Sequence, residues 1–176
     1  MDVSLIETLI EEHGKDLYNF CKRITYNEFD AEELYQDTFL KAMDAAERID
    51  VNNNPKSYLL SIAVSLWNNK KRKYARRNRI APTDSLDDEN NFSVAADTNT
   101  PEDRVLQKEL YKTVNNCINE LDDKMRIPIV LYYNSGLSVE KIAEIIKCPQ
   151  GTVKSRLHKA RNLLRERLEV YGIDGF

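Results

Sequence analysis

The sequence predicts an all-α protein of two helical domains joined by a flexible acidic linker. Apolar residues recur at three- and four-residue spacings through most of the chain, as on one face of a helix, and few segments alternate as a half-buried strand does. Five glycines and five prolines are few for 176 residues, a length sufficient for one or two domains. The most informative pattern lies in residues 137–161, which read as two short helices joined by a tight turn.

Two helices are expected in the first 50 residues. Residues 1–24 carry apolar residues at helical spacing, which predicts an amphipathic helix. Asp30 can cap a second helix, and Glu33 lies three residues on, as a capping box requires. This second helix is expected to run to about Arg48.

A third helix and a linker follow. Asn54 is a suitable cap and Pro55 suits the first position of a helix, which is expected to end near Arg79. Residues 80–101 are rich in Pro, Asp, Asn, Ser and Thr. Residues 80–103 hold seven acids and no Lys or Arg, which predicts a flexible acidic segment that buries little surface.

Helix is expected to resume near Glu102, because Thr100 and Pro101 give a start signal. Residues 122–126 read as a break, and residues 127–134 read as a short apolar helix. The longer helix before the break has an apolar stripe that is expected to face a core. Its members are Val105, Leu106, Leu110, Val114, Cys117, Ile118 and Leu121.

The helix-turn-helix pattern follows the short apolar helix. Pro149 ends the first helix of the pair, because proline cannot continue a helix. The second helix has an apolar stripe of Val153, Leu157, Ala160 and Leu164. Its opposite side is polar and cationic, with Gly151, Ser155, His158, Lys159 and Asn162 on it and Thr152 and Lys154 beside it. Such a surface suits the major groove of DNA, although an ordinary helical hairpin with a solvated basic face is the alternative.

Charge is segregated along the chain, although the net charge is only −3. Residues 51–79 hold eight Lys or Arg and no acid, and residues 151–176 hold six Lys or Arg against three acids. Two separate cationic blocks are typical of contact with nucleic acid. Residues 1–50 hold thirteen acids and five Lys or Arg, so this part would repel phosphates and is expected to meet a protein.

Cysteine usage and the N-terminus indicate a cytoplasmic protein. Cys21, Cys117 and Cys148 are scattered and odd in number, which fits a reducing compartment and predicts no disulfide framework, metal site or cofactor. No run is long and apolar enough to insert into a membrane, and the acidic N-terminus lacks the layout of a signal peptide.

Three strings together resemble a known family. They are D-A-E-E-L-Y-Q-D-T-F-L-K-A at 30–42, P-K-S-Y-L-L-S-I-A at 55–63 and G-T-V-K-S-R-L-H-K-A-R at 151–161. In this order and spacing, nearly the whole chain resembles bacterial RNA polymerase sigma factors of the extracytoplasmic-function (ECF) group. The resemblance implies a region-2 domain at 1–79, a linker at 80–101 and a region-4 domain at 102–170. It also implies a subunit that binds core RNA polymerase, directs it to promoters and promotes DNA opening.

The resemblance assigns core-polymerase binding to the second helix, against the clamp helices of the largest polymerase subunit. Residues four positions apart share a helix face, so a mixed acidic, amide and apolar strip is expected there. Its members are Asp30, Glu33, Gln36, Asp37 and Leu40. A solvated helix side is the plain alternative. Paired carboxylates could also suggest acid-base chemistry, but no His, Ser or Cys is placed to work with them, so no enzyme is expected.

The third helix and the turn before it are assigned to the melted, single-stranded promoter element. Residues expected there are Asn52, Asn53, Asn54, Tyr58, Ser65, Asn69, Lys70, Lys71, Arg72, Lys73, Arg76 and Arg77. The asparagines could read base edges and the cations could follow phosphates. Tyr58 and Trp67 could stack on bases or fill the core. Val64, Ser65 and Asn69 stand where relatives often have Arg, Asn and Asp, so the base sequence read there is not implied.

The second helix of the helix-turn-helix is assigned to the duplex of the distal promoter element. The residues expected at the DNA are Gly151, Thr152, Lys154, Ser155, His158 and Lys159. Gly151 and Thr152 lie at the helix N-terminus, where free N–H groups suit a phosphate. Arg156 lies nearer the apolar stripe and is expected to be structural or to bind a phosphate.

A free-standing repressor or activator that binds an operator as a dimer is the main alternative function. One recognition helix reads few bases, so that class usually needs two copies, and the 30–42 string has no role in it. The resemblance further implies an anti-sigma factor that holds the chain inactive by covering the polymerase-binding surfaces.

Overall fold

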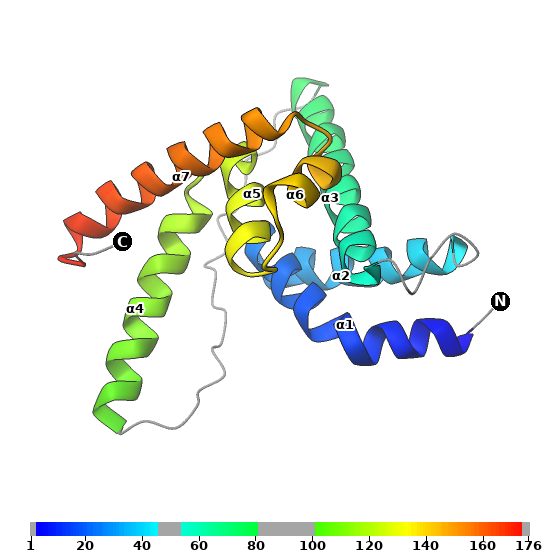
Figure 1. Cartoon of the computed structure of the whole chain (residues 1–176), viewed down its shortest axis with the longest axis horizontal. Coiled ribbons are helices and arrows are strands. Elements are labelled where there is room, and N and C mark those ends of the chain that lie inside the picture. The colour runs from blue at the N-terminus through cyan, green and yellow to red at the C-terminus, as the bar shows by residue number, and fades with distance from the viewer. Residues whose placement is uncertain (1–2, 46–53, 81–100, 174–176) are drawn as a thin grey trace.

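The computed structural model describes residues 3–45, 54–80 and 101–173, and the prediction of an all-α protein is confirmed in these ranges. Seven helices follow one another without a strand in the described residues (Figure 1). Their bounds are α1 (Val3–Ile24), α2 (Glu28–Asp44), α3 (Pro55–Ile80), α4 (Pro101–Asn119), α5 (Asp123–Tyr133), α6 (Val139–Ile146) and α7 (Gln150–Val170). The linker predicted at 80–101 falls almost wholly outside the described residues.

Helices α1 to α3 form an N-terminal unit in which each helix packs against the other two. The side chains that fill it lie on one face of each helix, as their spacing predicts. They include Leu9, Leu17, Phe20, Ala31, Leu34, Leu59, Leu60 and Ala63. Gly14 allows α1 and α2 to approach closely, because a Cβ there would lie 2.9 Å from the hydroxyl of Tyr35.

The predicted cap of α2 is wrong, and that of α3 is confirmed. Asn27, not Asp30, is the N-cap of α2, and its side-chain oxygen accepts a hydrogen bond from the backbone N–H of Asp30 at 2.7 Å. Asp30 therefore lies in the first turn, where its charge suits the positive end of the helix. Asn54 caps α3 by accepting from the backbone N–H of Ser57 at 3.1 Å, and Pro55 is its first residue.

Helices α4 to α7 form a C-terminal unit with two departures from the sequence prediction. The break expected at 122–126 is shorter, because Asp122 caps α5 and Asp123 already begins it, which places Arg126 within the helix. Leu110 of α4 is 42% exposed and so lies outside the core, whereas Cys117, Ile118 and Leu121 are buried as expected.

The helix-turn-helix is confirmed as α6 and α7. Ser138 caps α6 by accepting from the backbone N–H of Lys141. Lys147 ends α6 in the left-handed conformation, with φ of 53°, and turns the chain toward Pro149. The predicted stripe on α7 faces inward, with Val153, Leu157 and Ala160 buried and Leu164 partly buried.

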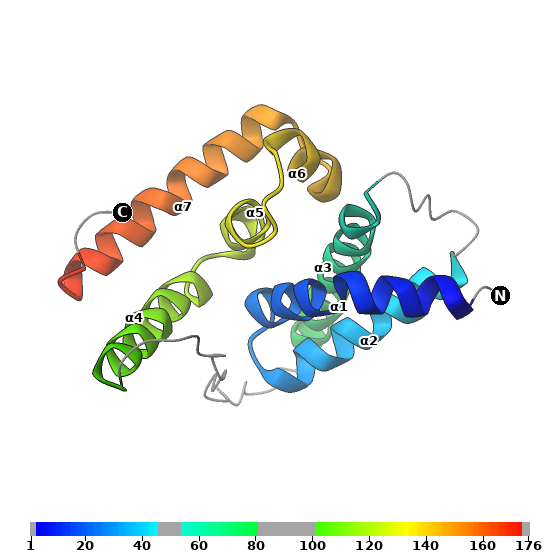
Figure 2. The same cartoon turned by 60° about the horizontal axis from the view of Figure 1, so that its bottom comes forward.

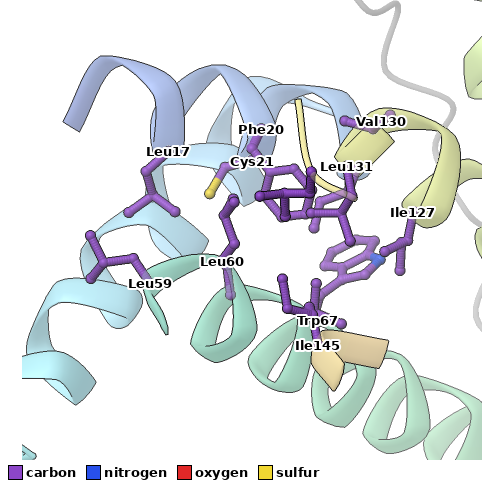
Figure 3. Close-up of a cluster of buried hydrophobic side chains, with 14 of the residues drawn as sticks. Leu17, Phe20, Cys21, Leu59, Leu60, Trp67, Ile127, Val130, Leu131 and Ile145 are labelled. Atoms are coloured by element: carbon purple, nitrogen blue, oxygen red, sulfur yellow. The ribbon is translucent and has the colours of Figure 1, made fainter. Parts of the chain in front are cut away.

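The two units pack directly against each other, which the sequence did not predict. Helix α5 lies against α1, and α6 lies against α3 (Figures 1 and 2). Buried apolar residues of both units form one continuous cluster. Trp67 of α3 lies beside Ile127 of α5 and Ile145 of α6 in this cluster (Figure 3). Helix α3, assigned to the melted element, is thus held against the first helix of the helix-turn-helix.

Candidate nucleic-acid and protein interface

The acidic strip predicted on α2 is a solvent-facing surface. The opposite side of α2 is buried through Ala31, Leu34, Thr38, Phe39 and Ala42. That leaves Glu33, Gln36, Asp37 and Leu40 exposed, with Leu40 at 59%. Phe29, one turn before Glu33, is 76% exposed. Acidic, amide and apolar groups therefore alternate on a surface that suits a protein partner better than DNA.

Lys70 of α3 joins the acidic strip to the basic segment of α3. Its Nζ lies 2.5 Å from Oδ1 of Asp30 and 2.5 Å from Oε2 of Glu33. Burial alone would lower the pKa of Lys70, but its hydrogen bonds to the two carboxylates outweigh burial, so the pKa is raised. Lys70 was expected to contact a DNA phosphate, and in this structure its charge is neutralised within the protein.

The remaining cations assigned to the melted element divide into exposed side chains and one that pairs within the protein. Arg72, Lys73, Arg76 and Arg77 are exposed along the second half of the helix. Lys71 is half-buried, and its Nζ contacts Asp123 of α5 at 3.1 Å and the hydroxyl of Tyr26 at 2.9 Å. Four exposed cations on about two helical turns form a surface that can follow a phosphate backbone.

The other residues expected at the melted element differ in how accessible they are. Ser65 and Asn69 are exposed, and Tyr58 is partly buried against the core. Asn54 is exposed, although its side chain caps α3. Asn52 and Asn53 lie outside the described residues. Trp67 is 2% exposed, so in this structure it fills the core and does not present a stacking face.

The cationic side of α7 is brought together as predicted. Gly151, Lys154, Ser155, His158 and Lys159 are exposed, and Thr152 is half-buried. Nothing lies within 4 Å of a Cβ built on Gly151, so the backbone there is open to a ligand. Arg156 is half-buried, nearer the apolar stripe, as expected.

Arg161 holds α7 against α5, and this role was missed from the sequence. Its Nε donates to the hydroxyl of Tyr133 at 2.9 Å, and its guanidinium lies 5.4 Å and 5.7 Å from the ring centres of Tyr132 and Tyr133. Cation–π contacts of this kind orient α7 against α5. The signal in the sequence was the adjacent tyrosine pair, which was read only as part of an apolar helix.

The thiols and carboxylates offer no reactive cluster in the part of the chain that the structure describes. No group of three or more His, Cys, Asp or Glu there could hold a metal ion. Burial raises the pKa of Cys21 to about 12, which makes its thiol a poor nucleophile. Within the same residues, no helix is long and apolar enough to cross a membrane.

Comparisons with known proteins agree with the two units. Residues 9–77 match the family model of Sigma-70 region 2, and residues 111–164 match Sigma-70, region 4. An ECF RNA polymerase sigma factor, SigW of Bacillus subtilis, is 33% identical over 172 residues, covering 95% of this chain and 90% of the relative. The ECF RNA polymerase sigma-E factor of Haemophilus influenzae is 32% identical over 145 residues, covering 80% of this chain and 75% of the relative.

Two solved structures share the fold. The sigma factor RpoE in complex with the anti-sigma factor NepR, from Bartonella quintana, matches with a TM-score of 0.76 and 28% identity, covering 96% of this chain and 99% of that chain. CnrH in complex with the cytosolic domain of CnrY matches with a TM-score of 0.63 and 24% identity, covering 94% of this chain and 88% of that chain. These comparisons do not support the alternative of a free-standing repressor.

Proposed function

Because this chain belongs to the ECF sigma factors, which direct RNA polymerase to promoters, we propose that α2 binds the core enzyme and that α3 and α7 contact the two promoter elements. The observation that carries this division of roles is the separation of surface chemistry. The acidic and apolar strip lies on α2, and the exposed cations lie on α3 and α7. On this proposal the protein works in the cytoplasm and has no catalytic activity of its own.

The α2 strip is the polymerase-binding surface. Leu40 and Phe29 supply exposed apolar area, and Glu33 and Asp37 supply charge that can pair with cations on the clamp helices. Such mixed surfaces gain affinity from the apolar centre and orientation from the charged rim. Lys70 shields Glu33 in the free chain, so binding of the core exchanges this internal pair for an intermolecular one.

The exposed cations of α3 bind the backbone of the melted strand. Unstacking a base costs a few kcal/mol, so affinity for the single strand is what favours melting. Arg72, Lys73, Arg76 and Arg77 contribute phosphate contacts without sequence preference. Ser65 and Asn69 lie exposed on the preceding turns, where their polar side chains can approach base edges.

The exposed side of α7 reads the distal element from the major groove. His158 and Lys159 reach toward base edges, while Thr152 and the backbone of Gly151 contact a phosphate at the helix N-terminus. Arg161 and the tyrosines of α5 hold this helix in place.

An anti-sigma factor is the further partner we propose. Both solved relatives were determined with a partner protein: RpoE with the anti-sigma factor NepR, and CnrH with the cytosolic domain of CnrY. The exposed α2 strip and an apolar groove of about 580 Å³ between α4, α5 and α7 are surfaces that such a protein could cover. A covered α2 strip would be closed to the polymerase.

Binding to core polymerase tests the proposed role of α2. The triple variant Glu33→Ala, Gln36→Ala, Asp37→Ala should bind core more weakly while its helical content stays unchanged. The matched control changes two carboxylates and one amide on the exposed side of α1, as Glu7→Ala, Glu11→Ala, Asn19→Ala. Equal core affinity of the two triple variants would exclude the α2 strip as the binding surface.

A further inference from the structure

We propose that the apolar groove between α4, α5 and α7, from here on the α4–α7 groove, is a binding site for a free fatty carboxylate, a single alkyl chain with an anionic head group. The site is separate from the α2 strip and from the exposed cations of α3. Binding of the ligand is independent of the proposed function, whereas its effect on transcription rests on that function.

The walls of the α4–α7 groove are mainly apolar. The groove has a volume of about 580 Å³, and in Figure 2, where α5 is seen nearly end-on, α4 and α7 lie on different sides of it. The apolar residues that line it are Val114, Ile118, Ile129, Val130, Leu164 and Leu168. Small-molecule sites typically measure about 300–1,000 Å³ and combine apolar walls with a few polar groups. The groove therefore has the size of a site for one alkyl chain.

The rim of the α4–α7 groove is cationic. Arg23 of α1 contributes one positive charge, and Arg161 and Arg165 of α7 contribute two more beside His158. The three residues of α7 are three and four positions apart, so they share one helix face. None of the described residues that line the groove is Asp or Glu. Since the whole chain has a net charge of −3, the positive rim is a local feature, and an apolar ligand with a negative head group complements it.

Two of these arginines have neutral partners within the protein. Arg23 hydrogen-bonds with the side chains of Asn115 and Tyr111. The Nε of Arg161 donates to the hydroxyl of Tyr133 at 2.9 Å. Hydrogen bonds between a guanidinium and a carboxylate are about twice as strong as those between neutral groups, and the planar guanidinium can donate two of them in parallel. Both arginines therefore retain a positive charge that a carboxylate head group can pair with.

Arg165 is the cation of the rim that is most open to a ligand. It is exposed, and its Nη2 lies 3.4 Å from Oδ1 of Asn162. Its Nε lies 4.0 Å from Oε1 of Glu169, which is the outer limit of an ion pair, so its guanidinium can turn toward a ligand. A free fatty carboxylate can place its whole chain between the helices while its head group reaches this rim. A lipid that stays in a bilayer cannot, because its chains remain among other lipids.

His158 connects the α4–α7 groove to the proposed reading face of α7. Its Nε2 lies 3.2 Å from Nδ2 of Asn162, and both residues line the groove. A carboxylate that draws the imidazole into a hydrogen bond removes a donor from the base edges. Its negative charge would also repel nearby phosphates of the promoter. Occupancy of the groove is therefore expected to weaken reading of the distal element.

Calorimetric titration of the full-length chain with dodecanoate, below its critical micelle concentration, tests the site. We expect saturable binding of one dodecanoate per chain. Dodecyltrimethylammonium has the same alkyl chain and a positive head group, and it should bind at least about tenfold more weakly, because the charged hydrogen bonds are lost. Phosphatidylglycerol vesicles should not carry the chain with them in flotation. Equal binding of the two amphiphiles, or no saturable binding of dodecanoate, would overturn the proposed ligand.

Variants place the ligand in the groove. Arg165→Ala should weaken dodecanoate binding about two- to fivefold, the loss expected for one exposed ion pair. Arg79→Ala removes an exposed arginine of α3 that does not line the groove, and this matched control should bind as the unchanged chain does. Val114→Trp should fill the groove and abolish binding, with circular dichroism to check its fold. Equal affinity of Arg165→Ala and Arg79→Ala would exclude the cationic rim as the head-group site, whether or not Val114→Trp folds.

Promoter-directed transcription with purified core polymerase measures the consequence of binding. Dodecanoate should lower transcription from promoters that depend on the distal element. The concentration that halves this transcription should be about two- to fivefold higher for Arg165→Ala than for Arg79→Ala, in step with the loss of affinity. Equal concentrations would overturn the link between the groove and the reading face. If the chain directs no transcription even without dodecanoate, the proposed function fails and the link with it, whereas the titrations still decide the site.

Discussion

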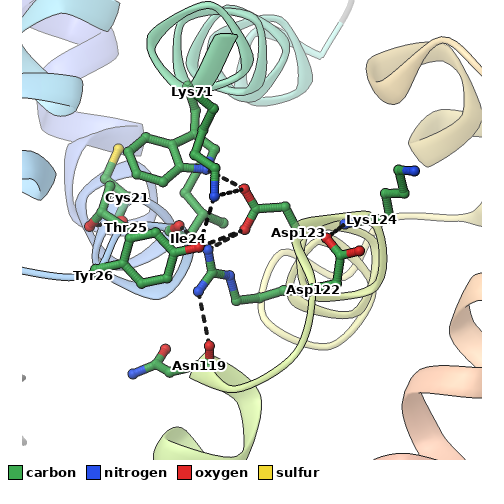
Figure 4. A network of polar contacts seen from close by, with 11 residues as sticks. Cys21, Ile24, Thr25, Tyr26, Lys71, Asn119, Asp122, Asp123 and Lys124 are labelled. Carbon is green, nitrogen blue, oxygen red and sulfur yellow. Dashed lines mark hydrogen bonds and ion pairs between the residues drawn. The ribbon is translucent and has the colours of Figure 1, made fainter. Parts of the chain in front are cut away.

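Arg126→Ala should be among the most destabilising single changes in this chain. The Arg126 side chain is fully buried and donates to the carbonyls of Ile24 and Asn119 at 2.8 Å and 3.2 Å, besides pairing with Asp123 (Figure 4). Hydrogen bonds to a charged group contribute about 1.5–3 kcal/mol each, and removing one partner of a buried ion pair costs about 3–5 kcal/mol. We therefore expect a loss of about 3–5 kcal/mol in the free energy of unfolding.

Urea unfolding followed by circular dichroism and by Trp67 emission measures this loss. Because Arg126 joins the units, the Trp67 transition should move to lower urea than the helical transition, which shows that the units separate before they unfold. Arg165→Ala is the matched control. Arg165 is exposed, and its Nε lies 4.0 Å from Oε1 of Glu169. A surface ion pair of this kind contributes about 0–1 kcal/mol to stability. Equal midpoints for the two variants would refute the reasoning from burial.

Three further predictions concern the reading helix, its support and the buried thiols. His158→Ala and Lys159→Ala should each lower the free energy of promoter binding by about 1–3 kcal/mol and relax selectivity at one position of the distal element. Transcription from promoter libraries measures this selectivity, and a shift confined to the melted element would contradict the proposed face. Val153→Asp places a carboxylate at a fully buried site and should unfold the C-terminal unit in thermal melts, which native-like melting would disprove. Burial raises the pKa of Cys21 to about 12, so the unfolded chain loses this proton first as pH rises, and stability should fall above about pH 9. Thiol reagents should modify the half-buried Cys148 before Cys21, and reaction in the reverse order would contradict the buried placement.

Local signals in the sequence predicted most of the secondary structure and the exposed polar side of α7. The spacing of Val153, Leu157 and Ala160 is a property of one helix, so it specifies which side is buried whatever the helix packs against. Pro149 and Asn54 act on the residues next to them: α6 ends before Pro149, and α3 begins directly after Asn54, as expected. The cap of α2 was wrong because Asn27 and Asp30 are both good caps three residues apart.

Contacts between distant segments could not be predicted from the sequence. Lys70 and Lys71 read as free cations, because the carboxylates that hold them lie 37 or more residues away in the chain. Trp67 was compatible with stacking or with the core, and only the packing of α5 and α6 on α3 decides that it is buried here. Asp123 and Arg126 were read as a break, since a charged turn and the first turn of a capped helix have similar compositions.

Promoter-directed transcription with purified core polymerase tests the central claim most directly. Core enzyme alone should initiate transcription poorly on a promoter library that is randomised at both elements. Addition of this chain should select transcripts that share one distal and one melted sequence. The triple variant of Glu33, Gln36 and Asp37 should lose this activity, and the matched variant of α1 should keep it. Specific binding to an operator by a dimer of the chain, with no transcription when core polymerase is present, would contradict the account.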